Sequence, residues 1–410
     1  MQKRYLFAPV DKHLSELRQM AFITGPRQCG KTTLAKSLIG DLKSGRNYFN
    51  WDLPEHRRLL MTELFPGSFK LDQPDLARVG FDEIHKYKRW KNTLKGLFDH
   101  YEPKHTHWII TGSAMLNVYR KGQDSLLGRH FTYNLCPFSA GELAGGGTKV
   151  VSTIKSLAEM PLVSSPGKKA REYLELLYRL GGFPEPLFNG SESFLKKWRT
   201  SRLERLIHQD LASTEDLRNL PMVENLLYLL PDRVGNPLSI NSLREDLELH
   251  FETVKHWIEL LERVYYGFRV RAFAHKISKG IKKEAKFYLW DWTEVQEPGP
   301  RFENLMAAHL LKHVLYLNDL GLDDAALFFA KDREQREVDF VLCERRSPKI
   351  AIECKLSDEE PSPNLVRFAK QLGIKRCFQV VMNLNQPKVI DLSGVEIHIV
   401  SAASFLEQLQ

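Results

Sequence analysis

The chain has 410 residues, of which 43% are hydrophobic and 27% charged, a composition typical of globular proteins with about two to four domains. It carries 59 Lys and Arg against 51 Asp and Glu, and the resulting net charge of +8 is compatible with a nucleic-acid partner without requiring one. No apolar run approaches the ~18 residues that span a membrane, and residues 1–5 show no secretory apolar region. The five cysteines are scattered and form no C-x-x-C pair. We therefore expect no membrane anchor, no disulfide framework and a cytoplasmic location.

The segment from Gly25 to Thr32 has the spacing G-x-x-x-x-G-K-[ST] of a phosphate-binding loop. An apolar run precedes it and a helix-forming run follows it, so the motif lies between a predicted strand and a predicted helix. We expect backbone N–H groups and the positive end of the helix to face a phosphate. Lys31 would reach the β- and γ-phosphates of ATP, and the Thr32 hydroxyl would bind Mg²⁺. The residues predicted to bind the nucleotide are Gly25, Pro26, Arg27, Gln28, Cys29, Gly30, Lys31, Thr32 and Thr33.

Strand-like segments alternate with helical ones up to about residue 145, at 22–24, 48–49, 79–81, 108–111 and 131–135. This alternation predicts an α/β domain with a mainly parallel sheet and helices on both faces. We place this nucleotide-binding domain at residues 1–165.

Two acids follow the third of these strands. Asp82 would hold Mg²⁺, and Glu83 would polarise the attacking water as general base. The alternative is a solvated pair of acids at the start of a helix. The next strand ends in small polar residues, so Thr111 or Ser113 is predicted to contact the γ-phosphate or the lytic water, unless this is an ordinary turn.

Arg129 is a candidate for neutralising charge in the transition state, from its own subunit or across a subunit contact. The alternative is a surface arginine in an ion pair. The sequence leaves the oligomeric state open.

The middle of the chain is predicted to be helical and then to form a winged helix-turn-helix. Residues 166–220 contain two helices that we interpret as a lid over the nucleotide. Residues 221–292 contain helices near 223–230, 240–247 and 251–263, followed by a hairpin. Its lysines could contact DNA phosphates, namely Lys276, Lys279, Lys282, Lys283 and Lys286. The alternative is a protein-contact module, which the acids of the third predicted helix favour.

Two strand-like segments, 337–342 and 349–355, carry a second set of acids. Residues i and i+2 of a strand share a face, so Glu353 and Lys355 point the same way and Asp339 can join them. This is the D…E-x-K pattern of PD-(D/E)XK nucleases. Asp339 and Glu353 would hold Mg²⁺ or Mn²⁺, and Lys355 would orient a water or stabilise the developing charge.

Glu303, in a predicted helix from residue 301 to 311, matches the acid that many such folds place on their first helix and is a further candidate metal ligand. E-x-K alone carries no information, because residues 284–286 have it too. The alternative is a structural ion-pair cluster in an inactive nuclease. We place this α/β restriction-nuclease-like domain at residues 293–410.

Five motifs resemble, in chain order, a widespread group of bacterial and archaeal AAA-type ATPases: GPRQCGKTTL, FDEIHK, IITGSA, LLGRHFTYNLCPFSAGEL and GGFPEP. Members of that group carry a C-terminal domain of unknown function with a restriction-nuclease-like fold, and the segment KFYLWDWTEV…GPRFENLMAAHLL resembles that domain. The resemblance covers essentially the whole chain. It implies ATP binding and hydrolysis, and no settled biological role.

The sequence thus favours an ATP-driven enzyme in which nucleotide turnover gates a metal-dependent cut in nucleic acid, with DNA a better candidate than RNA. One alternative is a nucleotide-controlled switch that docks a protein or DNA without cutting it. Another is a DNA-binding regulator that uses the winged helix.

Overall fold

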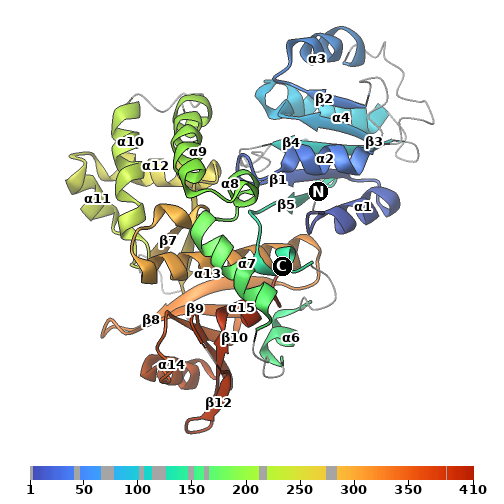
Figure 1. Ribbon diagram of the computed structural model, residues 1–410. Helices are drawn as coiled ribbons and strands as arrows, with labels where there is room; N and C mark the ends of the chain where they lie inside the picture. Colours follow the sequence, from blue (N-terminus) through green and yellow to red (C-terminus); the bar gives the residue numbers. More distant parts are fainter. Residues whose placement is uncertain are drawn as a thin grey trace. The chain divides into compact units, whose positions relative to one another are not determined.

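The computed structural model describes residues 3–40, 47–65, 78–100, 106–112, 126–145, 152–160, 166–211, 219–273, 284–384 and 386–410 (Figure 1). The chain forms two compact units, Met1–Cys136 and Pro137–Gln410. The four-part division expected from the sequence, with a first boundary at residue 165, stays a prediction. None of the helices in the described ranges is long and apolar enough to cross a membrane.

Unit 1 is built on a five-stranded parallel sheet with strand order β2-β3-β4-β1-β5, which confirms the predicted α/β class (Figure 1). Its strands are β1 (Met20–Thr24), β2 (Tyr48–Asn50), β3 (Arg78–Asp82), β4 (His107–Gly112) and β5 (His130–Asn134). Its helices are α1 (Phe7–Glu16), α2 (Lys31–Ile39), α3 (Pro54–Leu59), which continues as a π-helix (Leu60–Leu64), a 3₁₀ turn (Ile84–Lys86) and α4 (Trp90–His100).

Neighbouring residues of β3 explain how two helices cover the two faces of this sheet. Phe81 stacks between Phe49 of β2 and Trp108 of β4, with both pairs of ring centroids 5.7 Å apart, in the core to which α4 contributes. Gly80 points to the other face, where a Cβ atom would lie 2.6 Å from the Ile39 side chain of α2. The glycine that interrupts the apolar run of this strand therefore lets α2 approach the sheet closely.

Unit 2 contains an eight-stranded mixed sheet with strand order β12-β13-β11-β10-β9-β8-β6-β7. Its strands are β6 (Gly267–Ala272), β7 (Ala285–Leu289), β8 (Ala325–Lys331), β9 (Glu337–Glu344), β10 (Ser347–Lys355), β11 (Arg376–Val381), β12 (Lys388–Asp391) and β13 (Glu396–Ser401). The hairpin β6–β7, expected as a separate wing, joins this sheet because β6 pairs in parallel with β8.

The helices of unit 2 precede this sheet in the chain or lie between and after its strands. They are α5 (Ala140–Leu143), α6 (Ile154–Ala158), α7 (Lys168–Leu180), α8 (Pro184–Asn189), α9 (Glu192–Arg205), continued by a π-helix (Leu206–Leu211), α10 (Leu220–Leu229), α11 (Ile240–Asp246), α12 (Phe251–Arg263), α13 (Pro298–Asp319), α14 (Pro363–Leu372) and α15 (Ala402–Leu406), with 3₁₀ turns at Pro231–Arg233 and Trp292–Glu294. The predicted helices near 223–230, 240–247 and 251–263 are confirmed as α10, α11 and α12.

The block LCPFSAGEL forms a buried strap at the start of unit 2. The Lys312 ammonium of α13 donates to the Pro137 carbonyl at 3.0 Å, to Ser139 Oγ at 2.8 Å and to Glu142 Oε2 at 2.6 Å. A Cβ atom on Gly141 would lie 1.8 Å from the Leu409 carbonyl oxygen, so only glycine allows this approach. The strap therefore has a structural role in unit 2, because its polar groups are held by α13.

Candidate nucleotide-binding site and C-terminal charge cluster

Two glycines shape the loop between β1 and α2. Gly25 has φ +145°, and a Cβ atom there would lie 2.1 Å from the Leu135 carbonyl oxygen. Gly30 has φ +98° and is the residue directly before α2. Both backbone conformations are strained for any residue with a side chain. The loop therefore has the curled form that the sequence motif predicts.

The Lys31 side chain folds back over this loop. It is 6% exposed, and its ammonium donates to the carbonyl oxygens of Gly25 at 2.9 Å and Pro26 at 2.6 Å. A cation held among backbone groups at the start of a helix is placed where an anion would be attracted. Thr32 and Thr33 begin the same helix and are exposed. Arg27 and Gln28 are half-buried, and Cys29 is buried.

Asp82 lies at the end of β3, and its carboxylate accepts hydrogen bonds from hydroxyl groups of other elements. Thr32 Oγ1 donates to Asp82 Oδ2 at 2.7 Å, and the Tyr48 hydroxyl donates to the same oxygen at 2.6 Å. The Thr111 hydroxyl of β4 donates to Asp82 Oδ1. The carboxylate is 2% exposed. The two predicted Mg²⁺ ligands, Thr32 and Asp82, are therefore in direct contact.

Tyr48 is a site residue that sequence reasoning missed. Burial, and then the negative charge of Asp82, raise the pKa of Tyr48, so its hydroxyl stays a donor. The Lys36 ammonium of α2 lies 4.8 Å from the centroid of the tyrosine ring. The only signal in the sequence was its place in a strand of the sheet that carries the loop.

Glu83 follows Asp82 with φ +56°, in the left-handed region that a glutamate seldom adopts. Its carboxylate lies 3.5 Å from the Lys86 ammonium and 3.7 Å from His85 Nε2. Lys86 also binds Asp52 Oδ1 at 2.6 Å. Burial lowers the pKa of His85, which favours its neutral form. The turn therefore directs Glu83 away from its own strand and into an ionic cluster.

Arg129 is paired within its own subunit. Its Nε donates to Asp99 Oδ1 at 2.9 Å and a terminal nitrogen donates to Asp99 Oδ2 at 3.1 Å. This bidentate pair agrees with the alternative interpretation of Arg129 as a surface arginine in an ion pair. Ser113 lies outside the described residues.

An arginine near the start of the chain supports the loop from the side. The Arg4 guanidinium is 9% exposed and donates to the carbonyl oxygens of Cys29 and, at 2.6 Å, Cys136. The hydroxyl of Tyr5 accepts from the Cys136 N–H at 3.1 Å and donates to the Asn134 carbonyl. These bonds join the loop to the chain leaving β5. Nothing in the sequence pattern indicated them.

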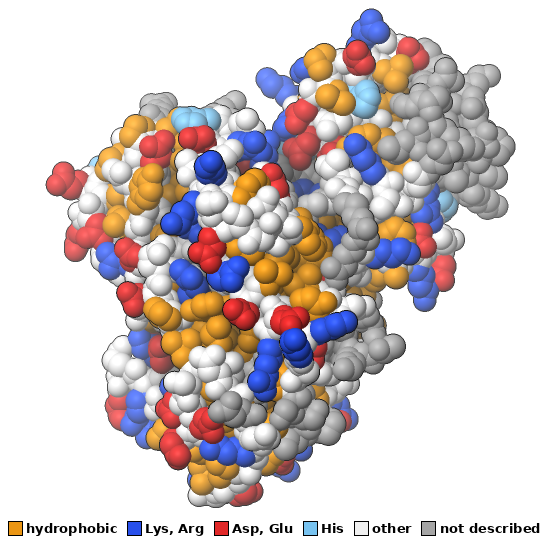
Figure 2. All heavy atoms as spheres, in the orientation of Figure 1, with side chains coloured by type: hydrophobic (Ala, Val, Ile, Leu, Met, Phe, Trp, Pro, Cys, Tyr) orange, Lys and Arg blue, Asp and Glu red, His pale blue; other side chains and the backbone are white. Residues whose placement is uncertain are grey.

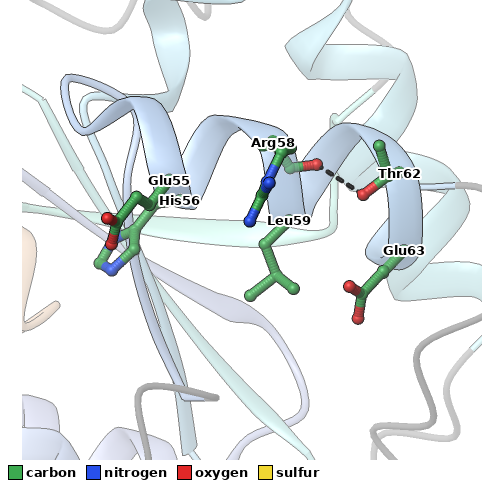
Figure 3. Close-up of a pocket in the computed structure, with 6 residues that line it drawn as sticks. All are labelled: Glu55, His56, Arg58, Leu59, Thr62 and Glu63. Carbon is green, nitrogen blue, oxygen red and sulfur yellow. Dashed lines mark hydrogen bonds between the residues drawn. The ribbon is translucent and has the colours of Figure 1, made fainter.

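A surface pocket of about 420 Å³ lies on α3 and the π-helix that continues it (Figure 3). Its lining residues are Glu55, His56, Arg58, Leu59, Thr62 and Glu63. None of them is a predicted site residue.

The C-terminal acids come from β9, β10 and α13. On β10, the Lys355 ammonium lies 3.1 Å from Glu353 Oε1. On β9, Asp339 Oδ2 accepts the backbone N–H of Cys354 at 2.8 Å. Burial raises the pKa of Asp339. Burial and the nearby charge of Asp339 raise the pKa of Glu353 to about 8 and that of Glu303 to about 7. The predicted residues therefore form one cluster of interacting charges.

Lys286 occupies the side of this cluster between α13 and β9. Its side chain is completely buried, and its ammonium lies 3.0 Å from Glu303 Oε1, 3.1 Å from Glu337 Oε1 and 3.9 Å from Asp339 Oδ1. Burial lowers the pKa of Lys286, but the three carboxylates outweigh that effect and raise the pKa overall. The prediction that Lys286 could contact DNA phosphates is therefore wrong, because its side chain is completely buried. The four other lysines of the predicted hairpin, Lys276, Lys279, Lys282 and Lys283, lie outside the described residues.

The acids do not form a metal site as they stand. Within the described ranges, no group of three or more His, Cys, Asp or Glu side chains is arranged to hold a metal ion. Glu303 Oε1 instead accepts from Lys286 and, at 2.6 Å, from the Tyr288 hydroxyl. The side chains of Glu303, Asp339 and Glu353 therefore do not fit a divalent ion in this arrangement.

Comparison with known proteins defines the class of unit 1. Residues 17–144 match the model of a family described as an AAA domain. Residues 171–293 and 298–402 match two further models, each described as a domain of unknown function (DUF8612 and DUF4143). The first match, the parallel sheet and the curled loop identify an AAA-type P-loop ATPase domain, as the sequence predicted. The other two descriptions name no activity.

Two similar proteins of Methanocaldococcus jannaschii are both named as uncharacterized. The uncharacterized protein MJ1544 is 23% identical over 364 residues, which are 85% of this chain and 78% of that protein. The uncharacterized protein MJ1637 is 26% identical over 301 residues, which are 68% of this chain and 62% of that protein.

Similar solved structures include the ORC1 protein of Aeropyrum pernix in complex with DNA, at 12% identity and a TM-score of 0.30, covering 73% of this chain and 91% of that one. AMPPCP-bound DnaA from Aquifex aeolicus is 16% identical with a TM-score of 0.27, covering 64% and 88%. Similarity at this level identifies no shared site or activity.

Proposed function

We propose that the protein binds and hydrolyses ATP with Mg²⁺ at the loop between β1 and α2. One observation carries the proposal: the Thr32 hydroxyl and the Asp82 carboxylate, 50 positions apart in the chain, lie 2.7 Å apart beside the curled loop. A hydroxyl from the loop and an acid from the end of another strand of the same sheet are the pair that holds Mg²⁺ in P-loop enzymes. Bound Mg²⁺ would neutralise charge on the phosphates.

The remaining roles belong to residues around that pair. The Lys31 ammonium exchanges its two loop carbonyls for phosphate oxygens, because an anion is a stronger acceptor than a neutral carbonyl. Glu83 accepts the proton of the attacking water. Thr111 and Tyr48 fix the orientation of Asp82 by donating to its two oxygens.

The test compares ATP binding and turnover in matched variants. Lys31→Ala should abolish turnover and weaken binding, whereas Glu83→Gln should keep MgATP binding and lose turnover. Lys12→Ala is the control, because Lys12 is an exposed lysine of α1 whose side chain is 71% accessible. The proposal fails if the wild-type protein binds no nucleotide in a titration with Mg²⁺.

We further propose that nucleotide turnover controls unit 2, for which two actions can be separated. One is a metal-dependent cut in nucleic acid at Asp339, Glu353 and Lys355, supported by the 3.1 Å contact between Glu353 and Lys355. The other is docking of DNA or a protein without cutting. The buried Lys286 ammonium favours the second, because it lies where a cation would serve the first.

On the face that Figure 2 draws, acidic and basic side chains are interspersed among the described residues. A nicking assay with plasmid, single-stranded DNA and RNA decides between the two actions, with ATP and either Mg²⁺ or Mn²⁺ present. Cleavage that Asp339→Ala removes while ATP turnover persists would establish the cut. No cleavage of any substrate would leave docking as the action.

A further inference from the structure

We propose that Lys286 is the resident cation of the C-terminal cluster, taking the charge-neutralising place of a divalent metal ion. The inference concerns unit 2 alone and does not depend on nucleotide binding in unit 1. It applies to the carboxylates of Glu303, Glu337 and Asp339, which face the ammonium of this lysine.

The first argument is burial. The Lys286 side chain has no exposed surface, and an ammonium left unpaired in that position would strongly destabilise the fold. Hydrogen bonds of 3.0 and 3.1 Å to Glu303 and Glu337 offset this cost. The ammonium also stabilises the carboxylates, since three acids packed together repel one another unless a cation lies among them. The lysine and the acids therefore require each other.

The second argument concerns which oxygen atoms are already used. Glu303 Oε1 accepts both from Lys286 and from the Tyr288 hydroxyl. Asp339 Oδ2 accepts the N–H of Cys354, and Asp339 Oδ1 faces Lys286 at 3.9 Å. A metal ion between Glu303 and Asp339 would have to displace the lysine and break the bond from Tyr288. That exchange is disfavoured because it would break the two hydrogen bonds of the buried ammonium as well as the bond from Tyr288.

The third argument is the contrast with the opposite side of the cluster. Glu353 Oε2 is buried and has no hydrogen-bond partner among the described residues, whereas Glu353 Oε1 is bound by Lys355 at 3.1 Å and by the Ser362 hydroxyl at 3.4 Å. Lys286 does not reach this oxygen. Lys286 therefore pairs with the acids around Glu303, whereas Lys355 pairs with Glu353 and leaves the second oxygen of that carboxylate without a hydrogen bond from a described residue. The proposal therefore predicts that a metal ion binds this cluster only when the Lys286 ammonium is absent.

The test measures Mn²⁺ binding by the full-length chain without nucleotide. Electron paramagnetic resonance of the free ion reports how much Mn²⁺ stays unbound. Asp82→Asn is present throughout, so that the P-loop site does not contribute. With Lys286 intact, no stoichiometric Mn²⁺ site should be found. Lys286→Met, which is apolar and of similar length, should bind one Mn²⁺ per chain, about tenfold or more tightly than the parent. Adding Glu303→Gln should remove this gain.

Lys286→Arg is the matched control, because it keeps the charge and should leave Mn²⁺ unbound. Lys286→Met should also melt at a lower temperature in EDTA and recover part of the loss with Mn²⁺, whereas the parent melts at one temperature in both. One stoichiometric Mn²⁺ in the parent that Asp339→Asn removes would overturn the proposal. That result needs no Lys286 variant, so the proposal stays falsifiable even if Lys286→Met fails to fold.

Discussion

Replacing Lys312 by Met should lower the unfolding free energy of unit 2 by about 3–5 kcal/mol. The lysine side chain is 2% exposed and donates to the strap at three acceptors between 2.6 and 3.0 Å. Methionine fills a similar volume, so the loss does not come from a cavity. The loss of stability arises because the variant lacks the three hydrogen bonds and the cation that neutralises the buried Glu142 carboxylate.

The assay is urea unfolding of the full chain, with hydrogen exchange of residues 139–143 and α13 assigning the change to unit 2. Lys312→Met combined with Glu142→Gln should recover at least about 1.5 kcal/mol relative to the sum of the single losses, because the double variant buries no unbalanced charge. Lys168→Met is the control. The Lys168 side chain is 92% exposed, so this substitution should change the unfolding free energy by no more than about 0.5 kcal/mol. Additive losses in the double variant would refute the reasoning.

Further predictions concern the two sites. Gly25→Ala should leave the fold of unit 2 intact and abolish ATP binding measured by titration, because the new Cβ atom meets the Leu135 carbonyl at 2.1 Å; binding at the wild-type level would contradict this. Tyr48→Phe should lower the stability of unit 1 by about 1–3 kcal/mol in the same urea assay, since it removes a donor to the buried Asp82 carboxylate; an unchanged midpoint counts against it. The raised pKa of Glu353, about 8 in the folded chain, means that the folded state holds its proton more tightly than the unfolded state. The stabilisation is complete below the unfolded pKa and is lost as the pH rises toward 8, so Glu353→Gln should flatten the fall in melting temperature between about pH 5 and 8. A parallel fall in both proteins would exclude Glu353 as the cause.

Local spacing was enough to predict the curled loop and the contact between its Thr32 and Asp82. The motif from residue 25 to 32 sets its own backbone shape, and Asp82 follows a buried strand, so parallel pairing brings both to one edge of the sheet. Tyr48 and Arg4 could not be found in this way. Their contacts depend on which elements become neighbours, and an isolated tyrosine or arginine has no pattern that reports this.

The C-terminal region shows where periodicity fails. The strands expected at 337–342 and 349–355 are present as β9 and β10, and alternation placed Glu353 and Lys355 correctly on one face. Lys286 was predicted to contact DNA phosphates together with the lysines that precede it in the hairpin. Its ammonium instead pairs with Glu303 of α13 and Glu337 of β9, and charge and hydropathy patterns do not encode such long-range contacts.

The continuity of β6 and β7 with the C-terminal sheet sets a lower limit on any fragment that could be moved or expressed alone. A fragment beginning at residue 293 would lack β6 and β7 and would expose the edge of β8 that pairs with β6. Exposed strand edges promote self-association. The fragment would also carry Glu303, Glu337 and Asp339 without the ammonium that holds them together. A C-terminal fragment that is transferred to another protein therefore has to include the hairpin of β6 and β7.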